Sequence, residues 1–399
     1  MSGSMDRFPS GPEAQATLAN WRTSPFNRWG FQHVREIVPS ADIPNDPDDL
    51  WRLPPVDTDL GALAIDDGRG GHVGLDEYLT RTSTDAFVVV HRGRVLREHY
   101  AHGMGPATPH ILMSVSKSML GLLAGILAAN GVLDFEAPAE QYVPEAKGSA
   151  FRGATVRQLL DMRSGLAFDE DYFATAGPIV QYRKATNWNP LEPSEAASDL
   201  RSFLQALDIP GGPHGGAFNY VSPCTDLLGW IIERASGRRF ADLFSELLWT
   251  RLGAARPCYI TVDRLGAPRC AGGMCMTAMD LARVGQLVAE GGRRGGRQIV
   301  PGGWIGDIVA AGDPDAWLVG PFVSYFPDRF MHYRAKWYVE RGAEPVLSCL
   351  GIHGQHLFVD PARQIVVAKF SSQASPLDGD AIRMTYRAFD AIRALLTGS

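Results

Sequence analysis

The chain has 399 residues, of which 45% are hydrophobic and 21% are charged, and its formal net charge is −6. This length is more than one ordinary core needs, and it suits two packed domains or one domain with a large insertion. The composition excludes an intrinsically disordered chain, and a negative charge without any run of Lys and Arg argues against nucleic acid as a partner.

No apolar stretch approaches the ~20 residues that span a bilayer, and the N-terminal residues lack the apolar core of a secretory signal. We therefore expect a cytoplasmic protein without a membrane partner. The oligomeric state is left open, with a homodimer as one alternative. The cysteines are widely spaced and form no C-x-x-C pair, so we expect buried, reduced thiols. They are Cys224, Cys258, Cys270, Cys275 and Cys349.

Residues 1 to about 55 are rich in Pro, Asp and Trp without a steady periodicity. This predicts an extended arm lying on the body of the protein, and we expect no chemistry from it. Two β-rich runs around an Arg-Gly turn predict an antiparallel hairpin over 85–100. From Leu112, the small and apolar residues of SVSKSMLGLLAGILAANG predict a buried helix that ends at Gly131.

Helical patterns then dominate to about residue 290, and strand-like segments return before a final amphipathic helix. The expected helices cover 155–162, 194–207, 224–236, 240–252, 280–290 and 381–396, and the expected strands 344–350, 356–359 and 364–370. If the two strand-rich parts pair, the fold is an α/β domain, an antiparallel sheet flanked by helices, with a mainly helical domain inserted. We expect an α/β domain of residues 1–110 and 285–399, a helical domain of residues 111–284, and a site between them.

The head of the apolar helix carries Ser114-Val115-Ser116-Lys117, and this spacing places Ser114 and Lys117 on one helical face. A serine hydroxyl becomes nucleophilic when a base takes its proton, and an amine is such a base if it is neutral near pH 7. Burial and the positive helix end both lower a lysine pKa, and free N–H groups there suit an oxyanion. The alternative is that Ser114 only caps the helix and that Lys117 is solvated, although a lysine in the first turn opposes the dipole.

Candidates for a second proton-transfer group and a second oxyanion donor lie further along the chain. Tyr220 follows the flexible GGPHGGA stretch, so its phenol can project from a loop, and a nearby ammonium would ease its ionisation. The alternative is a tyrosine packed in the core. In Gly351-Ile352-His353-Gly354, glycine exposes the backbone, and the N–H of Ile352 is a candidate oxyanion donor. His353 could instead serve as the base, but the chain has no G-x-S-x-G elbow.

Together, Ser114-x-x-Lys117, Tyr220-x-Ser222 and His353-Gly354 resemble, in order and rough spacing, the penicillin-recognising serine hydrolases with a class C β-lactamase or esterase fold. TVRQLLDMRSGL resembles a helix-turn signature of the same group. Within it, the chain is most similar to the 6-aminohexanoate-dimer (nylon-oligomer) hydrolases, over most of its length after about residue 80. The segments that carry this likeness are SVSKS, EDY, TDLLGWIIERASG, DLARVG and GIHGQ.

This resemblance implies that Ser114, Lys117 and Tyr220 are catalytic and that the N–H groups of Ser114 and Ile352 form the oxyanion hole. It also places four residues at the substrate: Tyr172, Arg183, Ala271 and His353.

Two of these positions depart from the nylon-oligomer hydrolases. Arg183 stands where those enzymes have an aspartate that receives the substrate's ammonium, and Ala271 stands where they have an asparagine. Arg183 would repel an ammonium and could attract a carboxylate. We therefore favour esters over amides as substrates.

We expect no cofactor and no metal. The acidic run Asp169-Glu170-Asp171 has no histidine beside it and is more typical of a solvated loop or lid than of a metal site.

The sequence therefore predicts a serine hydrolase that forms an acyl-enzyme on small esters or amides. Three alternatives stay open: an acyltransferase on the same fold, a β-lactamase or D,D-peptidase, and a binding protein without catalysis. The β-lactamase alternative is weakened because His353-Gly354 replaces the usual Lys-Thr-Gly and because no export signal is present.

Overall fold

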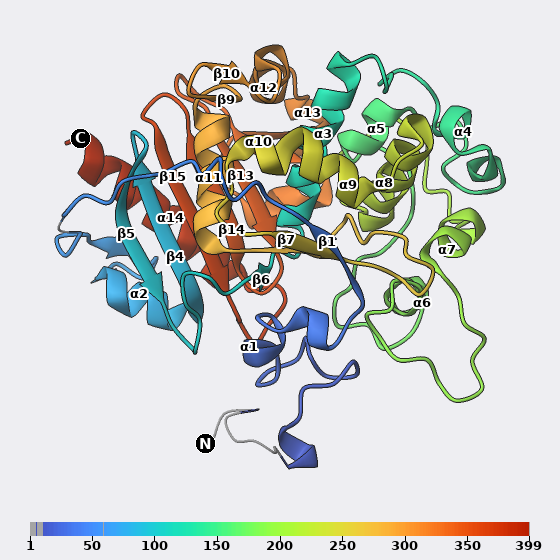
Figure 1. The fold of residues 1–399 in the computed structure, drawn as a ribbon, viewed down its shortest axis with the longest axis horizontal. Coiled ribbons are helices and arrows are strands. Elements are labelled where there is room, and N and C mark those ends of the chain that lie inside the picture. Colours follow the sequence, from blue (N-terminus) through green and yellow to red (C-terminus); the bar gives the residue numbers. More distant parts are fainter. Residues whose placement is uncertain (1–4, 6–10, 59, 399) are drawn as a thin grey trace.

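The computed structural model describes residues 5, 11–58 and 60–398. Its centre is a seven-stranded antiparallel sheet with the order β11-β12-β13-β14-β15-β4-β5 (Figure 1). The strands are β4 (Thr84–His91), β5 (Arg94–Tyr100), β11 (Met331–Arg334), β12 (Trp337–Glu340), β13 (Val346–Gly351), β14 (Gln355–Asp360) and β15 (Ile365–Ser371).

Strand β4 joins the early hairpin to the C-terminal strands. Val88 of β4 pairs with Glu98 of β5 on one side and with Ala368 of β15 on the other. The two strand-rich parts of the chain therefore form one sheet, which confirms the predicted α/β class. Nearly all of β4 is buried, because helices cover both faces of the sheet, and this explains its continuous apolar run.

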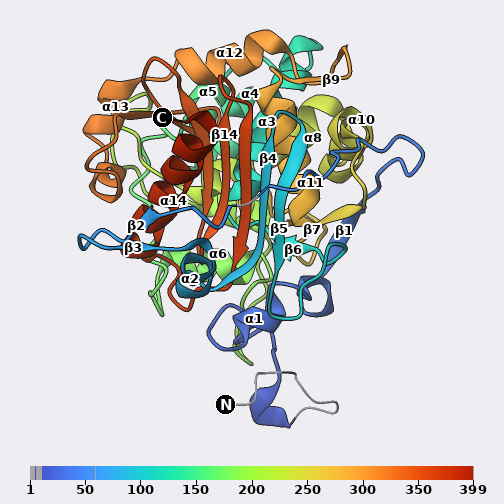
Figure 2. The same ribbon diagram turned by 90° about the vertical axis from the view of Figure 1, so that its left-hand side faces the viewer.

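Neighbouring residues of β14 contact different helices. Phe358 stacks on Phe389 of α14 (Gly379–Thr397), with ring centroids 4.7 Å apart. Leu357 instead faces α11 (Ala278–Ala289), where a Cβ on Gly285 would lie 3.0 Å from Leu357 Cδ1. Since side chains of a strand alternate between faces, α14 covers one face of the sheet and α11 the other (Figure 2).

The part of the chain between β6 and α11 is mainly helical, as predicted, and lies beside the sheet (Figure 1). Its helices are α3 (Val115–Ala129), α4 (Ala139–Tyr142), α5 (Val156–Leu160), α6 (Pro178–Ala185), α7 (Leu200–Ala206), α8 (Ser222–Ser236), α9 (Phe240–Phe244) and α10 (Thr250–Leu252). A π-helical turn, Ser245–Trp249, joins α9 to α10. Helix α7 is shorter than the predicted 194–207, whereas α5 begins with the reciprocal capping box of Thr155 and Gln158.

A four-stranded sheet with the order β1-β7-β8-β6 was not predicted. Its strand β1 comes from the N-terminal arm, where Ala41 pairs with Ile260 of β7. The predicted helical insertion therefore contains two short strands. They were not predicted because strands of this length show no periodicity in the sequence and their partners are distant in the chain. The four strands are β1 (Ser40–Ile43), β6 (His110–Ile111), β7 (Cys258–Thr261) and β8 (Met274–Met276).

The predicted arm begins with residues 1–4 and 6–10, which lie outside the described residues. From Trp21 onward the arm lies on the body, as expected, and specific contacts anchor it. Trp21 is fully buried, with its ring centroid 5.2 Å from that of Trp188. The N–H of Ile111, in β6, donates to Phe31 O over 3.0 Å. The arm therefore passes beside β6, the strand that leads into α3.

The remaining elements are short or peripheral. They are α1 (Asn27–Gly30), α2 (Leu75–Arg81), α12 (Gly302–Ala310), α13 (Pro314–Leu318), β2 (Ile65–Asp66), β3 (His72–Val73), β9 (Arg293–Arg294), β10 (Arg297–Gln298) and the 3-10 turns Pro12–Ala14, Val34–Glu36, Pro144–Gly148 and Pro321–Tyr325. All five cysteines are buried and free, as predicted. Within the described ranges, no helix is both long and apolar enough to span a bilayer. The domain boundaries at 110/111 and 284/285 stay a prediction.

Candidate active site

Ser114 lies at the N-terminal end of α3, directly after a turn in which Met113 has a φ of +46°. A non-glycine residue in this region costs roughly 1–3 kcal/mol and is held by its surroundings. Met113 is fully buried, so packing on this residue holds the strained turn. The Ser114 side chain makes no capping hydrogen bond to its helix. The capping alternative is therefore not what the structure shows.

Lys117 points back along the helix to Ser114, and its Nζ donates to Ser114 Oγ over 2.9 Å. The same amine donates to the backbone oxygen of Ala271 over 2.6 Å. The side chain is buried, and this desolvation lowers its pKa to about 7, although Glu170 opposes the change. An amine with this pKa is partly neutral at neutral pH, which a general base requires.

The carbonyl that holds Lys117 is itself fixed. The N–H of Ala271 donates to Asp226 Oδ1 over 2.8 Å, and the other carboxylate oxygen of Asp226 forms a buried ion pair with Arg269. The predicted site residue Ala271 thus acts here through its backbone, and Asp226 of α8 sets the position of that backbone.

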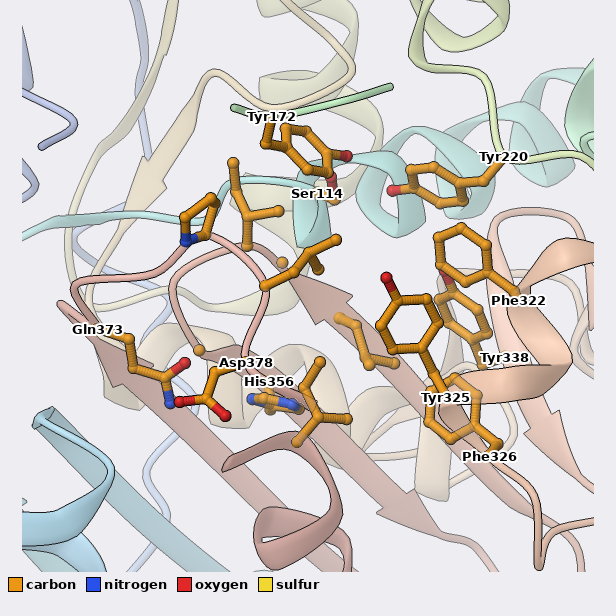
Figure 3. A pocket seen from close by; sticks show the side chains of 17 residues that line it. Ser114, Tyr172, Tyr220, Phe322, Tyr325, Phe326, Tyr338, His356, Gln373 and Asp378 are labelled. Carbon is orange, nitrogen blue, oxygen red and sulfur yellow. The ribbon is translucent and has the colours of Figure 1, made fainter. Parts of the chain in front are cut away.

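Tyr220 precedes α8, and its hydroxyl points toward Ser114 (Figure 3). Its ring centroid lies 4.9 Å from Lys117 Nζ. Burial and the charge of Glu170 raise the Tyr220 pKa well above its usual value, and a hydrogen bond with Ser114 only partly opposes this. This direction is opposite to the expected easier ionisation, because desolvation and Glu170 outweigh the contributions of Ser114 and Arg269, and Tyr220 stays a protonated phenol.

The turn between β13 and β14 closes the site from the other side. A Cβ on Gly351 would lie 2.7 Å from Leu112 O and 3.1 Å from Met113 Cβ. Only glycine therefore lets the end of β13 come this close to the turn before Ser114. Among the described residues, no acceptor is found for the N–H of Ser114 or of Ile352, and both residues line the same pockets.

His353 is not brought to Ser114. Its Nδ1 bonds to Gln373 O at 2.7 Å, its ring packs against Phe31, and burial lowers its pKa to about 4. It lines neither of the two pockets that include Ser114. The structure thus gives no support to the Ser-His alternative, and it places the His353 side chain away from Ser114, behind the turn between β13 and β14.

Tyr172 lies above Ser114 (Figure 3) and donates to Glu170 Oε2 over 2.6 Å. Glu170 also accepts from the N–H and the hydroxyl of Ser222 in the first turn of α8. The acidic run was expected to be a solvated loop or lid, but Glu170 is half-buried and ties the loop of Tyr172 to α8. Within the described ranges, no group of His, Cys, Asp and Glu is arranged to hold a metal ion.

Two pockets meet at Ser114, and both are lined by Tyr172 and Ile352. The first includes Tyr220. The rest of its wall is mainly aromatic and aliphatic (Figure 3), with Phe322, Tyr325, Phe326, Tyr338, Leu350 and Ile382 among its residues. The second is lined by Ala271 and three arginines: Arg22, Arg183 and Arg269.

A family model described as β-lactamase matches residues 75–391. The chain belongs to the β-lactamase family. It is 36% identical over 370 residues to the 6-aminohexanoate-dimer hydrolase of Paenarthrobacter ureafaciens, a match that covers 93% of this chain and 91% of that protein. The predicted resemblance is thereby confirmed.

Solved structures agree with this family. A Bacillus anthracis protein assigned as a 6-aminohexanoate-dimer hydrolase superposes with a TM-score of 0.88 at 28% identity, covering 98% of this chain and 99% of that one. A family VIII carboxylesterase shares the fold, with a TM-score of 0.57 at 16% identity over 77% of this chain and 92% of that one. The predicted β-lactamase-like fold class is confirmed.

In this member of the β-lactamase family, several residues that shape the site were missed by sequence reasoning. Asp226 and Arg269 fix the carbonyl that holds Lys117, and Arg22 reaches the site from the arm that was expected to carry no chemistry. No local pattern marks these side chains. The one available signal was Asp226, a charged residue within the otherwise apolar start of the helix CTDLLGWII.

Proposed function

We propose that the chain is a serine hydrolase that forms an acyl-enzyme at Ser114 on small carboxylic esters or linear amides. The observation that carries this proposal is the 2.9 Å contact between Lys117 Nζ and Ser114 Oγ, made by an amine whose pKa burial lowers to about 7. Membership of the β-lactamase family supports it. So does the likeness to a protein named for hydrolysis of a linear amide dimer.

In the first half-reaction, neutral Lys117 accepts the hydroxyl proton as Ser114 Oγ bonds to the carbonyl carbon. The carbonyl oxygen becomes an oxyanion, to which the N–H groups of Ser114 and Ile352 donate. The intermediate then re-forms its C=O bond and releases the leaving group. Tyr220, a protonated phenol, gives the leaving group its proton and regains one from Lys117.

In the second half-reaction, water attacks the ester of Ser114. Lys117 accepts a proton from that water as the oxyanion forms again at the same N–H groups. Lys117 then returns this proton to Ser114 Oγ as the bond from Oγ to the acyl carbon breaks, so Ser114 leaves as the alcohol. The carboxylic acid is released, and the free enzyme is restored. An amine or alcohol in place of water would give acyl transfer, so product analysis with an added nucleophile separates the two reactions.

Intact-mass spectrometry after mixing with an activated neutral ester tests the proposal. We expect a mass increase of one acyl group that is lost in Ser114→Ala and retained in Ser116→Ala, the neighbouring serine of the same motif. Lys117→Met should form the adduct far more slowly. An adduct that persists in Ser114→Ala, or no adduct with any ester, would overturn the assignment.

We further propose that the protein works in the cytoplasm on a small-molecule substrate. The five buried cysteines support this, because none of them forms a disulfide and free thiols persist in reducing compartments. The homodimer stays a prediction, which light scattering of the purified chain would test.

A further inference from the structure

The second pocket at Ser114 is lined by more positive than negative side chains. Three arginines line it, namely Arg22 from the arm, Arg183 from α6 and Arg269 from the segment before β8. Glu170 is the one carboxylate in the described lining of this pocket. The pocket beside Ser114 is therefore rich in positive charge.

The carboxylates near the pocket are already engaged. Asp226 pairs with Arg269, and Glu170 accepts from Tyr172 and Ser222. Across the described ranges, neither Arg22 nor Arg183 has a carboxylate oxygen within ion-pair distance. Two guanidinium groups thus face one pocket without a direct ion pair, although Glu170 and Asp171 partly offset the charge of Arg183 through space.

Of the two guanidinium groups, that of Arg22 is the more strongly desolvated. Its guanidinium carbon lies 5.8 Å from the ring centroid of Trp188, and its terminal nitrogen donates to the Asn189 side chain. Its Nε is buried and has no hydrogen-bond partner in the described part of the chain. Burial, together with the charges of Arg183 and Arg269, lowers the Arg22 pKa to about 9.

Arg183 has only neutral partners. Its guanidinium donates to the backbone oxygens of Asp171, Tyr172 and Ala174 over 3.4, 3.1 and 3.3 Å. These contacts are long for hydrogen bonds from a charged donor. They hold the Tyr172 loop, but none of them is an ion pair, and Glu170 and Asp171 act on the charge of Arg183 only through space.

The position of Tyr220 assigns the two pockets to the two halves of a substrate. In the proposed mechanism Tyr220 gives its proton to the leaving group, and Tyr220 lines the aromatic pocket but not the arginine pocket. The leaving group therefore occupies the aromatic pocket, and the acyl chain extends toward Arg22 and Arg183.

We propose that Arg22 and Arg183 bind a carboxylate at the far end of the acyl chain, so that the preferred substrates are mono-esters or mono-amides of dicarboxylic acids with an apolar leaving group. This inference rests on the proposed acyl-enzyme function. A carboxylate would supply the ion-pair partner that both arginines lack, and a guanidinium fork matches its two oxygens.

The test compares mono-4-nitrophenyl adipate with its methyl ester, which has the same acyl chain without the charge, after subtraction of spontaneous hydrolysis. Because a hydrogen bond to a charged group is worth ~1.5–3 kcal/mol, we expect kcat/KM to favour the free acid by about tenfold or more. Arg22→Met and Arg183→Met should remove most of this preference while the methyl ester is still turned over. Arg22→Lys should keep part of it. Arg28→Met, an exposed arginine of the same arm, is the matched control and should change neither rate.

Three results would overturn the inference. One is an equal loss on both esters in Arg22→Met, because this would make Arg22 only an anchor of the arm. Another is a wild-type enzyme that does not distinguish the two esters. The third is a preference that appears instead when the charge is on the leaving group, in 4-acetoxybenzoate compared with its methyl ester. In each case a Ser114 adduct with the neutral ester leaves the proposed function intact, whereas no adduct with any ester removes the function itself.

Discussion

Lys117 gives the site its expected pH dependence. Its pKa is lowered from 10.5 to about 7 by burial, and only the neutral amine can accept the proton of Ser114. For a neutral ester, kcat/KM should therefore rise about tenfold per pH unit below pH 7 and level off above it. A pH-rate profile from about pH 5 to 9 measures this, and a flat profile in the folded enzyme would contradict the role of Lys117.

Tyr220 should matter in proportion to how badly the leaving group needs a proton. Tyr220→Phe keeps the ring, which stacks on Phe322 with centroids 5.1 Å apart, and removes only the hydroxyl. We expect a loss of ~10²–10⁴ in kcat for an alkyl ester or amide, and a much smaller loss for a 4-nitrophenyl ester, whose leaving group departs as an anion. Equal losses for both substrates would show that the hydroxyl only positions Ser114.

Some residues of the site could be predicted from the sequence, and others could not. Ser114 and Lys117 lie within one helical turn, so their contact follows from helix geometry alone. Arg22 and Glu170 act in the site through contacts with distant segments, which no local pattern encodes. The protonation of Tyr220 was misjudged for a related reason: its burial depends on Phe322 and other residues that are about 100 positions away.

Among the elements, the turn between β13 and β14 is the most sensitive to a single methyl group. Gly351→Ala would place a Cβ against backbone oxygen Leu112 O and against Met113, so either β13 or the Ser114 turn must move. This would displace the N–H of Ile352, and losing one oxyanion donor typically costs ~10²–10³ in kcat. Steady-state kinetics measures the effect. Gly303→Ala in α12 is the matched control, because its Cβ meets open space. An unchanged kcat in Gly351→Ala would exclude Ile352 as a donor.

Elements with a long periodic pattern were predicted well, and short ones were not. Helices α3, α8 and α14 each repeat their apolar face over several turns. Strands β1 and β7 have four residues each, and their pairing depends on tertiary contact rather than on either sequence. The arm was correctly placed on the body, but its pairing into a sheet could not be read from Pro-rich and Asp-rich residues.

At the scale of the whole molecule, the arm should contribute to stability as well as to the site. Trp21→Ala removes a fully buried indole that packs on Trp188 and donates to Trp188 O over 3.2 Å. Removing a buried aromatic side chain costs ~3–5 kcal/mol of unfolding free energy, which chemical denaturation measures. Trp29→Ala, a half-buried tryptophan of the same arm, should cost clearly less. Equal and small losses would mean that the arm is only loosely held.

Because β4 pairs with β15, the central sheet cannot be completed until late in the synthesis of the chain. Strands β4 and β5 leave the ribosome early, but the strand that completes their sheet ends at Ser371. At ~5–20 residues per second, the apolar run of β4 waits for roughly 15–55 s before its permanent neighbour has been synthesised. During that interval the apolar strand β4 has one edge without a partner. Newly made chains should therefore depend on chaperones that bind before translation ends, and slow synthesis should lower the yield of folded enzyme.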